Sequence, residues 1–327
     1  MTGPLLELRE LRVEFPTRHG PLRALDGVSL DIAAGEILGV VGESGAGKSL
    51  AAAAVIGLLE PPGRVCGGQI LFEGERIDDL PREAMRRLRG RRIGAIFQDP
   101  LTSLNPLHTV GRQLVETLRT HLPLSAAQAR ARAIELLEQT GIAAAQARLA
   151  QYPHELSGGL RQRVVIALAL AGEPRLVIAD EPTTALDVAV QAQIIRLLRG
   201  ITLARGASVM LISHDMGVIA ETCDRVAVMY AGRVVEIGPV AEIVRRPAHP
   251  YTAGLMASVP SLHDEGARLA QIAGALPRLE DIPPGCAFHP RCPKASQKCV
   301  DERPELALVQ RTRAACWWPI VEAPGAP

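Results

Sequence analysis

The feature that most constrains the fold of this chain is a glycine-rich octapeptide between a strand-like run and a helix-like run. The wholly apolar run Ile37–Val41 predicts a buried strand, and the sequence GESGAGKS follows it directly. This octapeptide fits the pattern G-x-x-x-x-G-K-[ST], in which glycines let backbone N–H groups wrap a phosphate at a helix N-terminus. Its residues are Gly42, Glu43, Ser44, Gly45, Ala46, Gly47, Lys48 and Ser49. We expect Lys48 to contact the outer phosphates of a nucleotide and Ser49 to bind Mg²⁺; the alternative is a plain glycine turn before a helix.

Strand-like and helix-like runs alternate along most of the chain. Residues 48–59 predict a helix that ends before the turn at residues 60–63. Further apolar runs predict strands at residues 69–72, 92–97, 176–179, 208–213 and 226–230, with a helix at residues 191–199. This alternation predicts an α/β fold with a mostly parallel sheet.

Two stretches break the alternation. Residues 99–160 have helical spacing, including a helix at residues 126–139 with Ser125 as its N-cap and Gly141 just past its end. They predict an all-helical insertion. After Gly238 prolines become frequent, so we expect a nucleotide-binding domain over residues 1–238 and a small, loop-rich C-terminal module over residues 239–327.

Composition narrows the possible partners. The chain has 327 residues, 47% of them hydrophobic but only 3% aromatic, so its core must consist mostly of Ala, Leu, Ile and Val. The net charge of +1, with both signs interspersed, argues against a nucleic-acid partner. No apolar run approaches the roughly twenty residues of a membrane span, and the charged start of the chain is unlike a signal peptide. We therefore expect membrane association only through another protein.

Two carboxylates follow the predicted strand at residues 176–179. Asp180 comes at the end of a buried strand, where an unpaired carboxylate is costly and a Mg²⁺ ion would balance it. Glu181 is next to it and is placed to take a proton from an attacking water, so we predict that it is a general base. The alternative is a pair of strand-end carboxylates that cap the next helix.

A second anion site is predicted at Ser157, Gly158 and Gly159, which precede a helix-like run over residues 160–171. One chain binds one terminal phosphate but has two loops suited to it. The economical solution is a head-to-tail dimer, in which this loop faces a nucleotide held by the glycine loop of the partner. A plain N-cap with flexible glycines is the alternative.

Three more residues are candidates on their position alone. His214 follows the predicted strand at residues 208–213 and could reach the terminal phosphate, or be an ordinary loop histidine. Gln98 opens the helical insertion, where it could sense Mg²⁺ or the attacking water, or be a simple loop amide. Phe15 could stack on an adenine ring, or pack in the core.

Four of the six cysteines crowd into the end of the chain. Cys286, Cys292, Cys299 and Cys316 have the spacing C-x5-C-x6-C-x16-C. In a reducing compartment such a cluster indicates a metal site rather than disulfides. On chemistry alone four thiolates suit an iron–sulfur cluster or a structural Zn²⁺ equally, and unliganded thiols remain the third reading.

Taken together, these motifs resemble the ATP-binding subunit of ABC transporters over roughly residues 5–238. The resemblance rests on a Walker A motif at Gly42–Ser49, a Q-loop at Gln98, a signature at Leu156–Leu160, a Walker B motif ending at Asp180-Glu181, a D-loop at Ala185-Leu186-Asp187 and a switch histidine at His214. It implies a P-loop NTPase core with an antiparallel N-terminal β subdomain, a helical signature subdomain, and Asp187 as a further residue of the ATP site. It also implies that Gln98 joins Ser49 and Asp180 around Mg²⁺. Leu160 departs from the family pattern, because many members have Gln there.

A narrower resemblance comes from three segments: Phe97–Pro106, Arg246–Thr252 and Gly285–Pro293. They look like the ATPases of dipeptide and oligopeptide importers, and more like the D partner of the usual D/F pair. In that family the C-terminal cysteines are associated with a [4Fe–4S] cluster, so the resemblance favours this cluster over Zn²⁺.

The resemblance also implies partners and a location. A second ABC ATPase subunit, identical or of the F type, would complete the dimer. Two permeases would hold the chain at the cytoplasmic face of the cell (inner) membrane, and an extracytoplasmic peptide-binding protein would deliver cargo. Nickel, glutathione or another small solute is the alternative cargo. A soluble ABC ATPase of DNA repair or translation is the remote alternative, disfavoured by the single cassette and the near-neutral charge.

Overall fold

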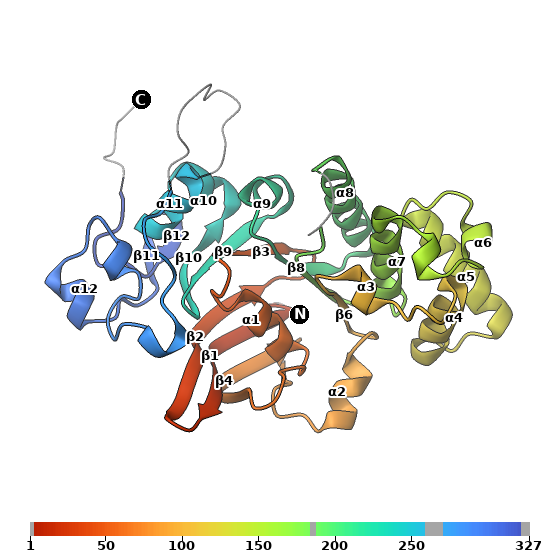
Figure 1. The fold of residues 1–327 in the computed structure, drawn as a ribbon, viewed down its shortest axis with the longest axis horizontal. Helices are drawn as coiled ribbons and strands as arrows, with labels where there is room; N and C mark the ends of the chain where they lie inside the picture. Colours follow the sequence, from red (N-terminus) through yellow and green to blue (C-terminus); the bar gives the residue numbers. More distant parts are fainter. Residues whose placement is uncertain (1–2, 184–187, 259–270, 322–327) are drawn as a thin grey trace. The chain divides into compact units, whose positions relative to one another are not determined.

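A computed structural model describes residues 3–183, 188–258 and 271–321 of the chain (Figure 1). These residues form two compact units. The first unit comprises residues 1–32, 38–78 and 213–327, and the second comprises residues 33–37 and 79–212. Among the described residues, none of the helices is both long and apolar enough to span a membrane.

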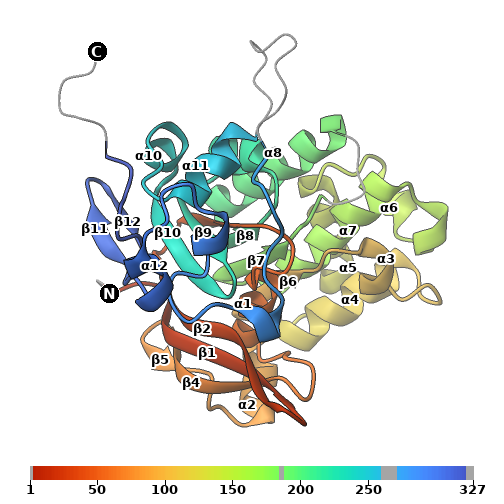
Figure 2. The same ribbon diagram turned by 60° about the vertical axis from the view of Figure 1, so that its left-hand side comes forward.

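An antiparallel sheet occupies the start of the first unit. Its strand order is β2-β1-β4-β5, and these strands lie side by side in Figure 2. Their bounds are β1 Leu6–Thr17, β2 Gly20–Ile32, β4 Arg64–Phe72 and β5 Glu75–Arg76. The structure thus confirms the predicted antiparallel β subdomain, and β4 is five residues longer than the predicted strand.

A second group of strands in this unit has the order β11-β12-β10-β9-β3. Strand β3 pairs in parallel with β9, whereas β9, β10, β12 and β11 pair antiparallel. The bounds are β3 Ile37–Val41, β9 Arg225–Tyr230, β10 Arg233–Pro239, β11 Ala307–Val309 and β12 Thr312–Ala314. All five residues of β3 are buried, as its apolar run predicts. Because β12 pairs with β10, the chain returns to this sheet near its C-terminal end.

Short helices complete the first unit. They are α1 Lys48–Val55, α9 Met216–Thr222, α10 Val240–Arg245, α11 Pro250–Ala257 and α12 Gln297–Asp301, with 3-10 turns η2 Leu279–Asp281 and η3 His289–Arg291. Helix α1 ends four residues earlier than predicted, because Gly57 adopts φ +61° and Leu58 is exposed. Tyr230, Tyr251 and Phe72 are the largest fully buried side chains among the described residues, and all three belong to this unit.

The second unit contains three parallel strands in the order β8-β7-β6. Their bounds are β6 Ile93–Ile96, β7 Leu176–Asp180 and β8 Ser208–Ile212. The strands are parallel in this unit and partly antiparallel in the other, so the sheet character is mixed. The prediction of a mostly parallel sheet holds for β3, β6, β7, β8 and β9 and is wrong for the strands that follow β9.

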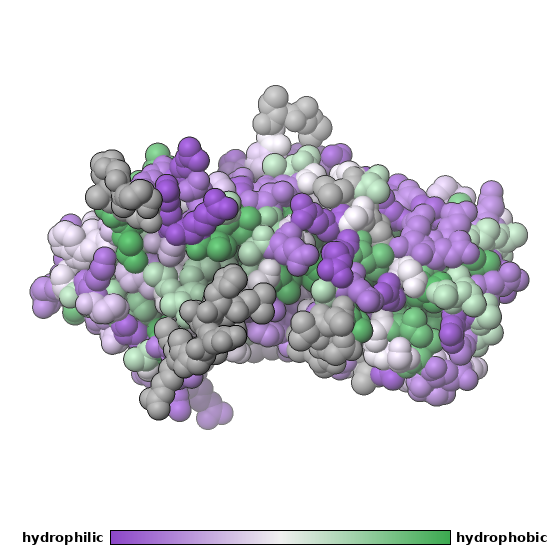
Figure 3. Space-filling model, turned by 90° about the horizontal axis from the view of Figure 1, so that it is seen from above, coloured by the Kyte–Doolittle hydropathy of each residue, from purple (hydrophilic) through white to green (hydrophobic). Residues whose placement is uncertain are grey.

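Helices make up the rest of the second unit. They are α2 Arg82–Leu88, α3 Pro100–Ser103, α4 Val110–His121, α5 Ala126–Gln139, α6 Ala145–Arg148, η1 Pro153–Glu155, α7 Gly158–Leu170 and α8 Val188–Arg205. Helices α4, α5 and α7 pack on one another (Figure 2). Leu114, Leu137 and other apolar side chains of these helices are buried. On the face drawn in Figure 3, hydrophilic and hydrophobic residues are interspersed, in line with the mixed charges of the sequence.

Candidate functional site

The glycine loop lies between β3 and α1, as the sequence predicts. Gly42, Gly45 and Gly47 have φ values of +152°, +85° and +100°, which L-residues rarely adopt. At Gly42 the backbone approaches so closely that an added Cβ would lie 2.2 Å from the Met229 carbonyl oxygen. Glycine is therefore required here by both conformation and space, and the result is a tight backbone turn into the N-terminus of α1.

Lys48 and Ser49 open helix α1 directly after this turn. Lys48 is buried, with 6% of the residue exposed, and its Nζ donates to the carbonyl oxygens of Gly42 at 2.7 Å and Glu43 at 3.1 Å. Ser49 is exposed on the first turn of the helix. The loop thus places a buried ammonium group and an accessible hydroxyl beside a helix N-terminus, which together suit an anion and its metal counter-ion.

In the second unit the structure brings Gln98 and Glu181 together. The Gln98 amide Nε2 donates to Glu181 Oε2 at 3.1 Å, and the Glu181 backbone N–H donates to the Ile212 carbonyl at 3.0 Å. Glu181 adopts φ +45°, a costly conformation for a residue other than glycine, and Asp180 precedes it at the end of β7. The strained backbone holds the Glu181 carboxylate at the end of the parallel strands, next to the Gln98 amide.

Ser157 is the N-cap of α7, a helix of 13 residues. Its Oγ accepts from the Leu160 N–H at 3.4 Å, and Gly158 and Gly159 form the first turn. Ser157 and Gly158 are exposed, whereas Leu156 is buried and anchors the segment. Exposed N–H groups at the start of a long helix can bind an anion, as the sequence predicts for this loop.

The remaining predicted residues differ in how far the structure describes them. His214 is exposed after β8, and its neighbour Asp215 caps α9 by accepting from the Gly217 N–H at 2.8 Å. The Phe15 ring lies on β1 against Gly63, whose added Cβ would be 2.7 Å from Phe15 Cε1. Asp187 lies outside the described residues. Phe15, the glycine loop and His214 belong to the first unit, and Gln98, the Ser157 loop, Asp180 and Glu181 to the second.

The four C-terminal cysteines line one small cavity of the first unit. Cys286, Cys292, Cys299 and Cys316 share it with two histidines and two tryptophans, and all four are free thiols. Burial raises the pKa of Cys286 and Cys292 and raises that of Cys316 to about 11. Among the described residues, however, no group of three or more His, Cys, Asp or Glu side chains is placed to hold a metal ion. The prediction of a metal-binding module is therefore not supported by the structure.

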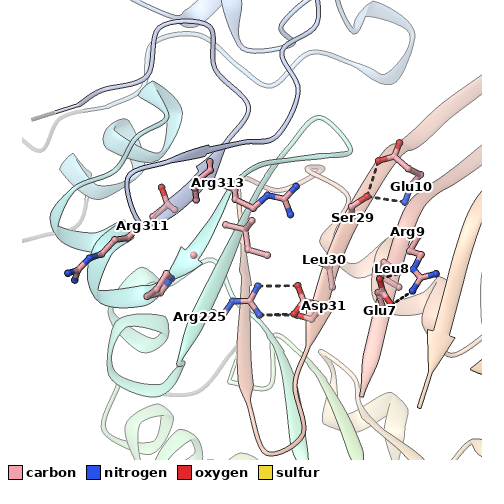
Figure 4. Close-up of a pocket in the computed structure, with 15 residues that line it drawn as sticks. Glu7, Leu8, Arg9, Glu10, Ser29, Leu30, Asp31, Arg225, Arg311 and Arg313 are labelled. Atoms are coloured by element: carbon pink, nitrogen blue, oxygen red, sulfur yellow. Dashed lines mark hydrogen bonds and ion pairs between the residues drawn. The ribbon is translucent and has the colours of Figure 1, made fainter. Parts of the chain in front are cut away.

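A different cavity, of about 560 Å³, lies between the N-terminal strands and β10, β11 and β12 (Figure 4). Two pairs of its charged side chains form ion pairs within the lining. The Arg225 guanidinium donates to both Asp31 carboxylate oxygens, at 3.1 and 3.2 Å, and Arg9 pairs with Glu7. None of the described residues that the sequence singled out lines this cavity. The candidate functional site is therefore the glycine loop rather than this cavity.

Three residues around the loop and the cysteine cavity could not be recognised from the sequence motifs. Arg291 donates to the Glu43 carboxylate, the Tyr251 hydroxyl accepts from the Glu43 N–H, and the buried Glu236 carboxylate accepts from the N–H groups of Ala248 and His249. Tyr251 and Arg291 lie inside two of the segments that carried the narrower resemblance, Arg246–Thr252 and Gly285–Pro293. Those segments were the available signal, but they gave no role for either residue.

The fold and the site define the class of the protein. Parallel strands, a glycine loop leading into a helix and a strand-end carboxylate pair are the features of a P-loop nucleotide-binding protein. Two family models match the chain: "ABC transporter" over residues 25–184 and "Oligopeptide/dipeptide transporter, C-terminal region" over residues 235–299. The chain belongs to the ABC transporter family, in the branch that carries this oligopeptide/dipeptide C-terminal region.

Similar proteins of known description agree with this placement. The chain is 48% identical to a probable peptide ABC transporter ATP-binding protein of Sinorhizobium fredii, over 96% of this chain and 94% of the relative. It is 46% identical to the oligopeptide transport ATP-binding protein OppD of Salmonella typhimurium, over 97% and 95%. Among solved structures, the dimeric bacterial ABC transporter cassette MJ0796 has a TM-score of 0.65 and 28% identity, covering 72% of this chain and 98% of the cassette.

Proposed function

We propose that this chain is the ATP-hydrolysing subunit of a bacterial ABC importer that takes up di- and oligopeptides. One observation carries the proposal: a single chain matches both the ABC transporter model and the C-terminal region of oligopeptide/dipeptide transporters. The similarity to peptide transport ATP-binding proteins extends over nearly the whole length of both chains. The energy source is then ATP, and the peptide itself is handled by other subunits.

The glycine loop would bind the triphosphate. The turn at Gly42–Gly47 leads into the N-terminus of α1, and Lys48 supplies positive charge beside it. The Ser49 hydroxyl and the Asp180 carboxylate are oxygen donors of the kind that Mg²⁺ prefers, so these residues would hold it, together with Gln98. Mg²⁺, when bound, neutralises charge that develops on the phosphates. Phe15 would stack on the adenine ring, and Asp187 would complete the ATP site.

Glu181 would act as the general base of hydrolysis. A base must lie within hydrogen-bond reach of the water that it activates, and the strand-end position leaves the Glu181 carboxylate half-exposed. The Gln98 amide, 3.1 Å from Glu181 Oε2, is placed to orient the same water. His214 would contact the terminal phosphate. In this assignment Glu181 accepts the proton of the water while the water oxygen attacks phosphorus and ADP leaves.

We propose a head-to-tail dimer with a second ABC ATPase subunit, either identical or of the F type. The Ser157-Gly158-Gly159 segment, in which Ser157 and Gly158 are exposed, would then face the ATP that is bound by the partner's glycine loop. The similar cassette MJ0796 is described as dimeric, including a post-hydrolysis state bound to ADP and phosphate. This similarity supports dimerisation but does not choose between the two kinds of partner.

Two permeases would hold the chain at the cytoplasmic face of the inner membrane. A groove of about 390 Å³ between β6, α3 and α7 is lined by Phe97, Thr102, Val165 and Leu168. Phe97 is 45% exposed and directly precedes Gln98. We propose that a cytoplasmic helix of a permease docks here, because a contact on Phe97 can be transmitted to the ATP site through its neighbour Gln98. A peptide-binding protein outside the membrane would supply the cargo.

Peptide uptake tests the proposed function. A host strain deleted for this chain is complemented with wild type or with Glu181→Gln, and uptake of labelled dipeptide and pentapeptide is measured. We expect wild type to restore uptake and Glu181→Gln to fail while it still binds ATP, because only the base is lost. Normal peptide uptake in the uncomplemented strain would contradict the peptide assignment, and nickel and glutathione uptake would then be measured in the same strains. Undiminished ATPase activity of Glu181→Gln would remove Glu181 from the base role.

We further propose that the four C-terminal cysteines bind a [4Fe–4S] cluster, although their described positions do not form a ligand set. The support is that all four thiols line the same cavity. Anaerobically purified protein is then expected to contain about four iron and four sulfide per chain, as this cluster requires. Zinc without iron would overturn the cluster in favour of a structural zinc site.

A further inference from the structure

Glu43, the second residue of the glycine loop, is held by two side chains from the far end of the sequence. The Arg291 guanidinium donates to both carboxylate oxygens, Nη1 to Oε2 at 2.7 Å and Nη2 to Oε1 at 2.9 Å. The Glu43 backbone N–H donates to the Tyr251 hydroxyl oxygen at 2.9 Å. Both the side chain and the main chain of this loop residue are therefore fixed from outside the loop.

Arg291 is itself anchored before it reaches Glu43. Its side chain is only 6% exposed, and its Nε donates to the Ala273 carbonyl at 2.9 Å. The guanidinium carbon lies 5.8 Å from the centre of the Tyr230 ring, a cation–π distance. The hydrogen bonds to Glu43 raise the pKa of Arg291 above its ordinary value. Because a guanidinium held in this way is planar and has little freedom, it imposes one orientation on the Glu43 carboxylate.

Tyr251 is a similarly rigid contact. It is fully buried in the first turn of α11, and its ring packs edge-on against Tyr230 with 4.7 Å between the ring centres. Burial raises the pKa of the Tyr251 hydroxyl, so the group remains neutral. A buried hydroxyl oxygen with a fixed ring accepts the Glu43 N–H in one geometry only.

The same part of the chain also lies close to Gly45 of the loop. A Cβ added to Gly45 would lie 3.2 Å from Leu276 Cδ2. Tyr251, Leu276 and Arg291 all fall within residues 235–299, which the oligopeptide/dipeptide C-terminal model matches. The C-terminal region therefore contacts the glycine loop at Glu43 and lies close to it at Gly45.

We propose that Arg291 and Tyr251 are positioning residues for the phosphate-binding loop, through which the C-terminal region sets the affinity of this chain for ATP. The proposal rests on the proposed role of the loop in ATP binding. A loop with three glycines has access to many conformations, and the apparent Kd rises in proportion as the binding-competent one becomes rarer. Arg291 also neutralises a carboxylate that would otherwise repel the phosphates. Both effects act through Glu43 and require no contact between Arg291 and the nucleotide.

Titration of the full chain with a fluorescent ATP analogue and Mg²⁺ tests the proposal. If about a tenth of the glycine loops that lack the contact between Arg291 and Glu43 are in the conformation that binds ATP, Arg291→Gln raises the Kd for the analogue about tenfold. Tyr251→Phe, which removes one acceptor, should raise it about threefold, by about half of the tenfold free-energy change. Arg291→Lys should fall between wild type and Arg291→Gln, because an ammonium cannot bind both carboxylate oxygens in the planar geometry. At saturating ATP, kcat should stay within about twofold of wild type, since the loop is then held by its ligand.

The matched control is Arg311→Gln. Arg311 lies in the same unit, is 80% exposed and pairs with Glu242 at 3.1 Å, so its loss should leave the Kd unchanged. The double variant Glu43→Gln/Arg291→Gln should bind no more weakly than Arg291→Gln alone, because both changes break the same contact. Additive losses would show that Arg291 acts elsewhere and would overturn the proposal.

Two outcomes separate this inference from the proposed function. If wild type does not bind the analogue, the ATP assignment fails and the inference fails with it. If wild type binds, Lys48→Ala does not, and Arg291→Gln, Tyr251→Phe and Glu43→Gln all bind as wild type does, the inference alone is overturned. Thermal melting identifies a variant that fails to fold. If Arg291→Gln fails to fold, the Kd values of Tyr251→Phe and Glu43→Gln test the proposal instead. Glu43→Gln changes the same ion pair at its more exposed side chain.

Discussion

At the scale of single residues, His249 shows how burial fixes a charge state. Its side chain is fully buried, and its Nδ1 accepts from the Tyr251 N–H at 3.1 Å at the start of α11. Burial lowers the pKa of His249 from 6.5 to about 3, so the imidazole is neutral in the folded protein. The Glu236 carboxylate accepts a hydrogen bond from the backbone N–H of His249 at 2.9 Å. Glu236 is also buried, and burial raises the pKa of its carboxyl group.

The difference between the pKa of His249 in the folded protein and its ordinary value of 6.5 predicts that the protein loses stability in acid. The pKa of His249 is depressed in the folded state, so its neutral imidazole contributes to the free energy of unfolding fully above pH 6.5. This contribution is lost as the pH falls toward 3. Between pH 7 and pH 5 the loss should be about 2 kcal/mol in the free energy of unfolding. Glu236 acts in the opposite direction, because its raised pKa favours folding at lower pH.

The comparison variant is His249→Asn, which can still cap α11 but does not titrate and leaves Glu236 in place. Chemical denaturation at pH 7 and pH 5 measures the effect. Wild type should lose about 2 kcal/mol more than the variant over this interval. Equal losses in the two proteins would show that His249 does not set the acid sensitivity.

At the scale of elements, the sequence predicts those helices and strands that are determined by residues close together in the chain. Helix α5 runs over residues 126–139 as predicted, because the Ser125 side chain and Gln128 form a capping box and Gly141 turns the chain with φ +73°. Strand β3 was equally clear from five consecutive apolar residues. Helix α4 begins at Val110, where the Thr109 side chain caps it by accepting from the Arg112 N–H.

Elements that depend on distant partners could not be predicted in this way. Strands β11 and β12 have only three residues each, and β12 forms through pairing with β10, for example Glu236 with Ala314. Strand β4 continues five residues beyond its apolar part because it pairs with β1, which satisfies its backbone hydrogen bonds whatever its side chains are. Pairing between distant strands leaves little trace in a local pattern of hydrophobicity.

At the scale of the whole molecule, the candidate site also has parts that come from a local motif and parts that depend on contacts between distant residues. Gly42–Ser49 could be predicted because a phosphate loop is a contiguous motif with fixed spacing. The contact between Glu43 and Arg291 could not, because the two residues are 248 positions apart and each is an ordinary charged residue in its own segment. Motifs thus predict candidate ATP-binding residues, whereas only the fold shows which distant residues contact the loop.

The two predicted anion sites, the glycine loop and the Ser157 loop, belong to different compact units of one chain. If the Ser157 loop binds ATP held by the partner, Ser157→Arg should leave the Kd of the isolated chain for ATP within about twofold of wild type. The ATPase rate of the complete transporter should fall at least about tenfold, because an exposed Arg replaces a hydroxyl where the two subunits close on the phosphates.

Lys48→Ala provides the comparison, since it should abolish ATP binding by the isolated chain itself. Both variants are titrated with the fluorescent ATP analogue as isolated chains and then assayed for ATPase activity in membranes that contain the permeases and both ATPase subunits. Weakening of ATP binding by Ser157→Arg in the isolated chain to the extent seen with Lys48→Ala would mean that the loop acts on the ATP of its own chain. The head-to-tail arrangement would then be wrong. Because the Ser157 cap contributes only about 1 kcal/mol to stability, loss of folding should not obscure the result.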